Sequence, residues 1–327
     1  MKLHNYPKEF NSLINVTAKS LNLQNHFVEK DYWITFILLK LSQSEYRENF
    51  IFKGGTALSK AYTVIERFSE DIDLALYLPE ATGNQRKKII DKTSKEITKD
   101  LKEVFMDEVT SKGSRFRRTV HEYPKTFSKL YPDQTTEKII VEINSFTQPK
   151  NYGYSQINSY IGDFLKKSKQ DEFIDQFELK EFGLYVLGLE RTLTEKIFSL
   201  VRASYGEKGQ EELKKKIRHI YDIYKILQIE NMKMFVESNE FFEILLQTRK
   251  DDSLNKDFYG DWINKPLLES LLFNDSNELW KNLSKVYEGE FSSLVYGDLP
   301  NISEVRKCIN TLSLRLKEFD KSYMKVL

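Results

Sequence analysis

The chain has 327 residues, of which 40% are hydrophobic and 30% charged, and its formal net charge is +1. A chain of this length can bury two hydrophobic cores, and its charge content excludes a membrane protein. The near-neutral total gives no argument for a nucleic-acid or membrane partner, so such an argument depends on local patches. The single cysteine, Cys308, excludes an internal disulfide and a cysteine zinc site.

The chain carries no obvious targeting or membrane segment. Its first residues, MKLHNYPKEF, lack the apolar core of a secretion signal. The longest apolar run, YWITFILLKL at 32–41, is about half of the ~20 residues that a spanning helix needs. Together with the single cysteine, these features lead us to expect a cytoplasmic protein that does not bind membranes.

The hydrophobic pattern predicts alternating helices and strands in the first half of the chain. Apolar residues recur at three and four over 8–43, which indicates helix. A strand at 50–53 then runs into a Gly54–Gly55 turn. Further on, the pattern predicts an amphipathic helix (56–68), a strand (72–78), a polar helix (85–105), two strands (116–131 and 137–146) and a turn between them (132–136).

After about residue 150 nearly everything reads as helix, including the apolar-periodic stretch that follows residue 180. The expected fold is therefore α/β in the broad sense (α+β), with a mixed sheet followed by an α-helical bundle. We place the boundary so that residues 1–185 form the first domain and residues 186–327 the second.

The stretch FKGGTALSKAYTVIERFSEDIDLAL, at 52–76, carries the clearest chemical signal. Residues two apart on a strand share a face, so Asp71 and Asp73 project together while Ile72 and Leu74 pack on the other side. Two carboxylates this close repel each other unless a positive charge lies between them. Mg²⁺ suits this role, because it takes a few carboxylates and completes its shell with water and substrate phosphates.

The preceding glycine turn supplies the second half of the signal. Gly54 and Gly55 allow backbone N–H groups to approach a ligand, and the helix predicted to start near Thr56 directs its positive end there. A glycine pair before a helix is usually only a tight turn, and a DxD is common on surfaces. Their combination within 25 residues on an apolar background favours a nucleoside triphosphate site.

A third carboxylate is expected in a two-metal site. Glu142 lies within the apolar strand KIIVEINSF and is the candidate, because a lone glutamate in a buried strand is costly unless it is paired or coordinating. The alternative is an edge-strand residue that faces water.

The stretches FKGGTALSKAY, RFSEDIDLAL, IIVEI, TLTEKIFSLVRA and IRHIYDIYKIL, with VEKDYWIT at 28–35, resemble one family. It is the AbiEii/MenT type of toxin among the polymerase-β-like nucleotidyltransferases. The resemblance implies Mg²⁺-dependent transfer of a nucleoside monophosphate from an NTP, with two ions, to an acceptor hydroxyl such as the 3′ end of tRNA. It also implies an antitoxin partner.

By position, the resemblance makes Asp71 and Asp73 metal ligands. Lys196 in TEKIF would contact the nucleotide phosphates, and Asp222 in IYDIY would complete the site from the helical side. The helical pattern around Asp222 leaves a second reading open, a surface salt bridge to Arg218 or Lys225 worth only ~0.2–0.5 kcal/mol.

Other polar residues near these motifs are candidate ligands of the nucleotide or the RNA. Arg67 would bind phosphate, or it would interact with the negative C-terminal end of the helix that precedes it. Ser69 would bind phosphate or carry a regulatory modification. Two basic clusters, 112–121 and 214–219, would hold an RNA backbone, with Phe116, Tyr123 and Phe127 as stacking surfaces. The nucleotide-binding set is Gly54, Gly55, Thr56, Lys60, Arg67 and Ser69, and the RNA-binding set is Arg115, Arg117, Arg118, Lys215 and Arg218.

Two other functions use the same residues. An antibiotic nucleotidyltransferase would modify a small hydroxylated molecule and would show an acidic pocket for a cationic drug. A non-catalytic scaffold would bind a partner through the helical half. Binding of Mg²⁺ and NTP separates the scaffold from both enzymes, and the identity of the acceptor separates the enzymes from each other.

Overall fold

The computed structural model describes residues 1–107, 109–113, 115–127, 137–149, 151–255, 258 and 260–323. The chain forms two compact units. The sheet unit comprises Met1–Thr63, Arg67–Ser145 and Tyr152–Leu187, and the helical unit comprises Val64–Glu66, Phe146–Asn151 and Gly188–Leu327. Two short segments, 64–66 and 146–151, thus join the helical unit although the sequence placed them in the first domain.

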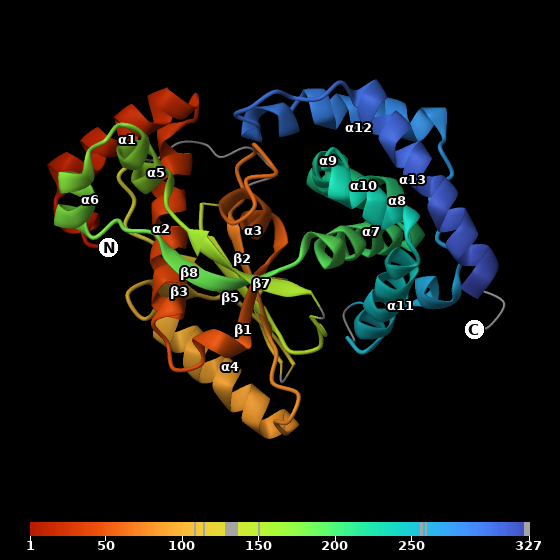
Figure 1. Ribbon diagram of the computed structural model, residues 1–327, viewed down its shortest axis with the longest axis horizontal. Helices are drawn as coiled ribbons and strands as arrows, with labels where there is room; N and C mark the ends of the chain where they lie inside the picture. Colours follow the sequence, from red (N-terminus) through yellow and green to blue (C-terminus); the bar gives the residue numbers. More distant parts are fainter. Residues whose placement is uncertain are drawn as a thin grey trace. The chain divides into compact units, whose positions relative to one another are not determined.

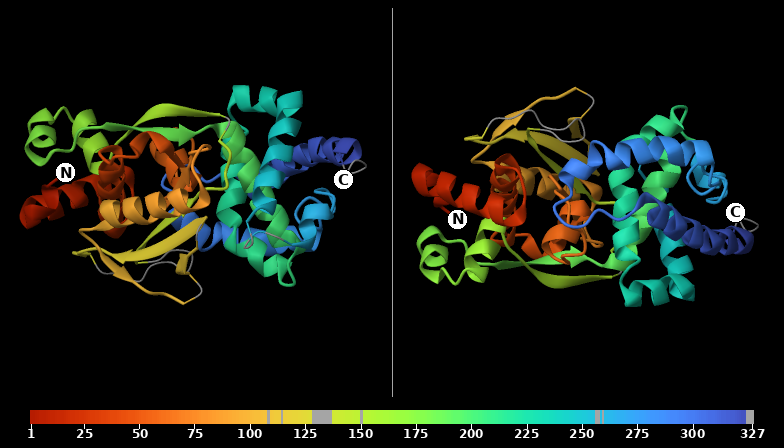
Figure 2. Two further views of the ribbon diagram at one scale, coloured as in Figure 1. Left: turned by 90° about the horizontal axis from the view of Figure 1, so that it is seen from below. Right: turned by 90° about the horizontal axis from the view of Figure 1, so that it is seen from above.

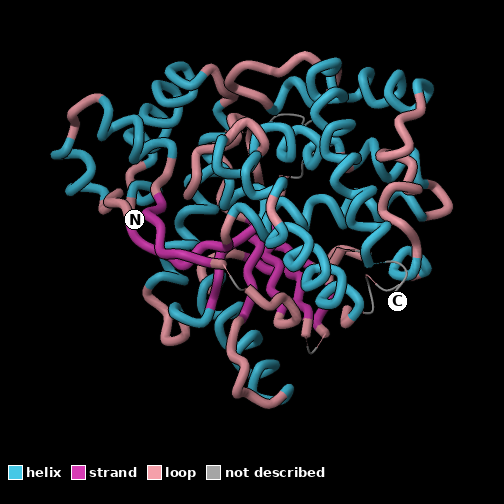
Figure 3. Tube along the Cα trace, turned by 45° about the vertical axis from the view of Figure 1, so that its right-hand side comes forward, coloured by secondary structure: helices cyan, strands magenta, loops and turns pink. Residues whose placement is uncertain are grey.

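Eight strands of the described chain form one mixed sheet in the order β3-β5-β6-β2-β1-β8-β7, with β4 paired to β5. Figure 3 shows the strands of this sheet in magenta. The β2–β6 and β1–β8 pairs are parallel, and the other pairs are antiparallel. This mixed sheet and the separate helical unit confirm the predicted fold class. The strands are β1 (Phe50–Lys53), β2 (Asp71–Leu76), β3 (Lys102–Val104), β4 (Ser111–Lys112), β5 (Phe116–Glu122), β6 (Ile139–Asn144), β7 (Tyr152–Ile157) and β8 (Phe182–Leu187).

Two helices of the sheet unit begin at signals that are visible in the sequence. A proline occupies the first turn of α1, and a Thr82–Gln85 capping box starts α4. Figures 1 and 2 show α1, α5 and α6 grouped at one side of this unit, where α1 and α6 both contact α5. The helices are α1 (Pro7–Leu21), α2 (Asn25–Ser42), α3 (Gly54–Lys60), α4 (Gly83–Thr98), α5 (Tyr160–Lys167) and α6 (Asp171–Phe177).

The two faces of the sheet differ in their cover. Ile72 and Leu74 are fully buried in the main core, which also contains residues of α2 and α4 such as Ile34 and Ile90. The opposite face carries only a small apolar cluster of Ile51, Ala75 and Leu187 within the described residues. Asp71 and Asp73 alternate with the core residues, so they lie on this second face, away from α2 and α4.

The helical unit is built around α7, which contacts α8, α9 and α11, while α13 packs on α9, α10 and α12. Its helices are α7 (Leu189–Tyr205), α8 (Gly209–Lys215), α9 (Ile217–Ile226), α10 (Glu230–Glu237), α11 (Asn239–Ser253), α12 (Asn277–Glu288) and α13 (Ile302–Tyr323). Short 3-10 helices occur at Leu3–Asn5, Arg47–Asn49, Asp261–Asn264 and Phe291–Leu294.

Several predicted elements were wrong in extent or type. The helix expected over 56–68 ends at Lys60, because Thr63 adopts a φ of 51° that no right-handed helix allows. The strand β8 was read as part of the helical half, since a short apolar run does not distinguish strand from helix. The predicted turn at 132–136 lies outside the described residues.

Candidate active site

The centre of the candidate site is a row of charged residues across four neighbouring strands. Asp73 on β2 pairs directly with Lys53 on β1 and with Glu142 on β6, and Glu142 pairs directly with Arg118 on β5. Directly paired residues of a sheet share a face. Asp71, two residues before Asp73, lies on the same face. The fold therefore gathers three carboxylates from the two motifs, with a basic residue at each end of the row.

Arg118 neutralises part of this acidic row. Its guanidinium donates to one oxygen of Glu142, with Nε at 3.0 Å and Nη2 at 2.6 Å from Oε2. Burial opposes the charged form of Arg118, yet its pKa is raised above the ordinary value. The carboxylates of Glu142, Asp73 and Asp71 outweigh the burial, which means that the row favours a bound positive charge.

Glu142 is therefore directed at Arg118 in this structure. Across the described residues, no group of three or more His, Cys, Asp and Glu side chains is arranged to hold a metal ion. Mg²⁺ is commonly held by only one or two carboxylates together with water and substrate phosphates. The donor chemistry of Asp71 and Asp73 fits such an ion, and the role of Glu142 as a third ligand stays a prediction.

The glycine turn packs directly against the acidic pair. Gly54 has a φ of 79°, and a Cβ added to it would lie 2.1 Å from Oδ2 of Asp73. A side chain at this position would meet the carboxylate, so glycine is required both by the backbone and by the space. The next residue but one, Thr56, donates its hydroxyl to the backbone oxygen of Asp71 at 2.6 Å. The start of α3 thus contacts strand β2 at the carboxylate of Asp73 and at the backbone oxygen of Asp71.

Arg67 and Ser69 reach the same turn from the segment that precedes β2. A Cβ added to Gly55 would lie 2.8 Å from Nη2 of Arg67 and 2.8 Å from Oγ of Ser69. The Arg67 side chain is buried and donates to the backbone oxygen of Phe68 at 3.0 Å. Since the helix predicted to end at Phe68 stops earlier, the helix-dipole role considered for Arg67 is wrong. The expected role in phosphate binding stays a prediction.

Lys60 does not face this turn. Its side chain is 3% exposed, and its ammonium lies 2.6 Å from Oδ1 of Asp31 and 3.0 Å from the backbone oxygen of Asn158. These contacts hold the charge inside the protein. The structure therefore gives no support for Lys60 as a nucleotide ligand and assigns it a structural contact.

The first basic cluster separates into residues of different kinds. Arg115 is exposed, whereas Arg117 is buried under α4, where Nη1 lies 3.0 Å from Oδ1 of Asp91. Tyr123 is buried and packs near Trp33, with ring centroids 6.2 Å apart, and Phe127 packs on the same core. Arg117, Tyr123 and Phe127 are therefore placed as core residues, not as an RNA-binding surface.

In the second basic cluster, Lys215 is exposed and forms an ion pair with Glu212 at 2.7 Å. Arg218 is half-buried on α9. Both residues lie within the helical unit, and their expected contact with RNA stays a prediction.

The helical unit contains a buried pair that the sequence considered only as two separate residues. The ammonium of Lys196 on α7 lies 2.6 Å from Oδ2 of Asp222 on α9, and the two side chains are 6% and 0% exposed. The alternative partners of Asp222, Arg218 and Lys225, were therefore wrong as the main contact. Lys225 instead pairs with Glu66 at 2.9 Å.

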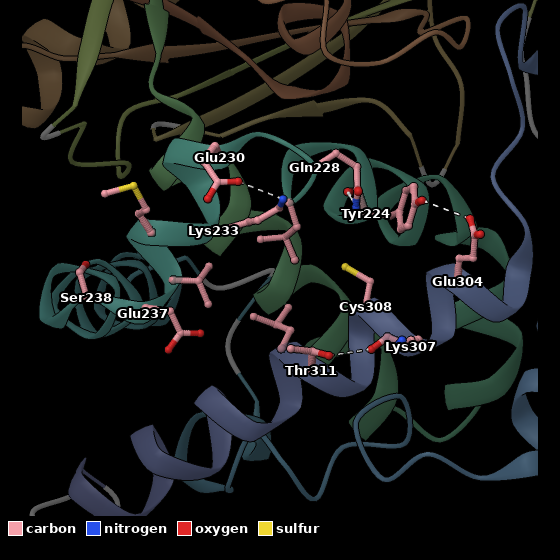
Figure 4. A pocket seen from close by; sticks show the side chains of 14 residues that line it. Tyr224, Gln228, Glu230, Lys233, Glu237, Ser238, Glu304, Lys307, Cys308 and Thr311 are labelled. Atoms are coloured by element: carbon pink, nitrogen blue, oxygen red, sulfur yellow. Dashed lines mark hydrogen bonds and ion pairs between the residues drawn. The ribbon is translucent and has the colours of Figure 1, made fainter.

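A cavity of about 1,070 Å³ lies in the helical unit, lined by residues of α9, α10 and α13 (Figure 4). Tyr224 and Cys308 both line it, and burial raises the pKa of the Cys308 thiol to about 11. This thiol is protonated at neutral pH and is a poor nucleophile. None of the predicted site residues lines this cavity, and its chemistry is separate from the charged row.

The sequence missed one polar set that contacts the segments of the site. Glu29, Lys30 and Asp31, in the VEKDYWIT stretch, are all buried in α2. Three adjacent charges inside the apolar run FVEKDYWITFILL were a usable signal, because charged residues are rarely buried without partners. Lys53 was also missed, since only strand register places it beside Asp73.

Comparison with known proteins gives the class to which this fold and site belong. The model of the family described as "Nucleotidyl transferase AbiEii toxin, Type IV TA system" matches residues 37–321. The chain therefore belongs to the AbiEii nucleotidyltransferase toxin family and is a nucleotidyltransferase. Membership implies an NTP substrate and an antitoxin partner. A comparison with curated protein sequences finds no match.

Among solved structures, the chain is similar to MenT4, a nucleotidyltransferase toxin from Mycobacterium tuberculosis H37Rv. The match has a TM-score of 0.52 and 15% sequence identity, and it covers 93% of this chain and 89% of that chain. At this identity the likeness supports the fold. In the described part of the chain, every helix is too short or too polar to cross a membrane.

Proposed function

We propose that this nucleotidyltransferase transfers a nucleoside monophosphate from an NTP to a hydroxyl of RNA, with the 3′ end of tRNA as acceptor, in a reaction that depends on Mg²⁺. The observation that carries the proposal is the charged row on the face of the sheet opposite the main core. Asp71 and Asp73 lie there beside Glu142, and a glycine turn contacts Asp73 directly. A carboxylate cluster beside backbone N–H groups suits a metal-bound triphosphate.

In this proposal Asp71 and Asp73 hold Mg²⁺, and Glu142 helps to hold a second ion or accepts the proton of the attacking hydroxyl. When bound, Mg²⁺ would neutralise phosphate charge and lower the pKa of the acceptor hydroxyl. The backbone N–H groups at Gly54 and Gly55 would contact the phosphates. Arg67 and Ser69 lie against the same turn and would orient the phosphate oxygens.

Lys196 and Asp222 have linked roles in the proposal. Asp222 fixes the Lys196 ammonium at 2.6 Å within the helical unit, so removal of the carboxylate would leave that charge buried without its partner. Lys196 would stabilise negative charge on the leaving pyrophosphate, and Asp222 would orient Lys196. Arg115 and Arg118 remain candidate contacts for an RNA backbone, because they lie outside the core that buries Arg117.

The test is direct labelling. Purified protein is incubated with each α-labelled NTP in turn, Mg²⁺ and total tRNA. The proposal predicts that label enters tRNA from a preferred NTP, and that chelation of Mg²⁺ or the substitution Asp71→Asn removes the signal. Absence of labelled tRNA with every NTP would contradict the RNA acceptor. Label on a small hydroxylated drug instead would favour the antibiotic-modifying alternative.

A further inference from the structure

Three consecutive charged residues lie inside the apolar helix α2. Glu29, Lys30 and Asp31 are 0%, 0% and 3% exposed. Successive side chains of a helix point about 100° apart, so the three charges cannot share one partner. Each of them must therefore be satisfied by a different segment of the sheet unit, because a buried charge without a partner is costly.

Lys30 contacts the start of strand β2. Its ammonium lies 2.6 Å from Oε2 of Glu70, and both side chains are almost fully buried. Glu70 is the residue immediately before Asp71. The contact therefore fixes the backbone at the point where the acidic pair begins.

Asp31 contacts the end of α3. Oδ1 lies 2.6 Å from the ammonium of Lys60, and Oδ2 accepts the backbone N–H of Tyr160 at 2.8 Å. Lys60 is the last residue of the short helix whose first residue is Gly54. This helix of seven residues connects the anchored Lys60 to the glycine turn.

Glu29 contacts the segment that follows β5. Its two carboxylate oxygens accept the backbone N–H groups of Thr126 at 2.6 Å and Phe127 at 3.1 Å. Strand β5 carries Arg118, the partner of Glu142. The three charges of one helical turn thus hold the three segments that carry the glycine turn, the acidic pair and Arg118.

The spacing between two of these segments is tight. Space for even one Cβ is lacking between Gly54 and Asp73, so a small displacement of α3 against β2 would move the carboxylate. A buried ion pair stabilises a fold little compared with an apolar pair of the same volume. A misplacement of about 1 Å at a reacting centre can cost ~10²-fold in rate.

We infer that Glu29, Lys30 and Asp31 are positioning residues of the nucleotidyl transfer, and this inference rests on the proposed function. They touch no reacting atom. They set the relative positions of the segments that hold Gly54, Asp71 and Arg118, and their effect on turnover is larger than their effect on stability.

The test replaces the Lys30–Glu70 pair by apolar residues of similar size, Lys30→Met with Glu70→Leu. We expect the double variant to fold with a Tm close to that of the wild type, while kcat falls by about tenfold or more and KM for the NTP changes less. Amide exchange at 70–73 should become faster. If the pair only stabilises the fold, the folded double variant should keep the wild-type kcat. That result would overturn the inference.

A matched pair of carboxylates supplies the control. Asp320 in the helical unit accepts two consecutive backbone N–H groups, from Leu267 at 3.0 Å and Leu268 at 2.9 Å, as Glu29 does in the sheet unit. Glu29→Gln should lower kcat by about tenfold, whereas Asp320→Asn should lower Tm and leave kcat within about twofold. Equal effects of the two substitutions on kcat would contradict the inference.

The two proposals fail in different ways. A wild-type protein that transfers no nucleotide contradicts the proposed function. In that case, amide exchange still tests the positioning, because the double variant must loosen residues 70–73, which the Lys30–Glu70 pair holds, relative to the wild type. Unchanged exchange in this segment would overturn the positioning role alone.

Discussion

The two faces of strand β2 are made by alternate residues of one six-residue segment, and they differ in almost every physical property. One face presents Asp71 and Asp73, both half-buried, within a row of charges. The other presents Ile72 and Leu74, both fully buried in the main core. The comparison teaches that one strand can hold the fold through one face and supply chemistry through the other. Substitutions at neighbouring positions should therefore fail for different reasons.

The largest expected effect comes from neighbouring residues on the two faces. Asp73→Asn should reduce transfer by on the order of 10²–10³-fold or more. It should change the free energy of unfolding little, because it removes repulsion from Asp71 and Glu142 together with attraction to Arg118. Leu74→Ala should instead lower the free energy of unfolding by about 2–5 kcal/mol through a cavity in the core. Initial rates and urea denaturation measure both quantities.

The comparison fails if the two variants behave alike. Retention of near-normal transfer by Asp73→Asn would remove Asp73 from the site. A stable Leu74→Ala variant would show that the helix-covered face does not hold the fold.

A second prediction concerns pH on the core face. Burial lowers the pKa of His121 to about 4, and its Nε2 lies 2.9 Å from Oγ1 of Thr119. Glu103 partly opposes the shift by attraction, and Arg117 and Lys112 reinforce it. Between pH 6.5 and 4 the unfolded chain binds a proton at this histidine and the folded chain does not. Stability from His121 is therefore fully present above pH 6.5 and is lost as the pH falls towards 4, by about 3 kcal/mol.

Urea denaturation of the wild type and His121→Gln across this pH range isolates the contribution. As the pH falls from 6.5 to 4, the free energy of unfolding of the wild type should decrease by about 3 kcal/mol more than that of His121→Gln. A difference that does not change with pH would show that His121 has the same pKa in the folded and unfolded chains.

The third prediction concerns the glycine turn, where the two halves of the candidate site meet. Gly54→Ala forces a side chain into a φ of 79° and against Asp73, and should cost about 1 kcal/mol together with a clear loss of transfer. Gly83→Ala is the matched control, because a Cβ there meets no atom within 4 Å and the residue begins α4. Equal transfer activity of the two variants would show that the glycine turn takes no part in nucleotidyl transfer.

The sequence predicted the features that depend on local pattern. Alternation around Asp71 and Asp73 placed both carboxylates on one face, and the apolar background of KIIVEINSF placed Glu142 in a strand, which the structure pairs with β2. The mixed sheet and the helical half followed from periodicity, and the fold class is confirmed.

The features that depend on contacts distant in sequence were not predicted. The register that places Arg118 beside Glu142 and Lys53 beside Asp73 appears in no local pattern. Lys60 was read as a phosphate ligand because its partner Asp31 lies 29 positions earlier in the chain. The length of α3 was overestimated because the positive φ at Thr63, just beyond its end, is not visible in the helical pattern of the residues.

The central claim is that Asp71 and Asp73 together hold a divalent cation beneath a triphosphate. Its most direct measurement is the binding of Mn²⁺, as a spectroscopic substitute for Mg²⁺, with a non-hydrolysable NTP analogue to the wild type and to Asp71→Asn with Asp73→Asn. The account predicts Mn²⁺ bound with the analogue to the wild type and loss of that binding in a double variant that remains folded. Equal binding of Mn²⁺ and analogue by both proteins would contradict it.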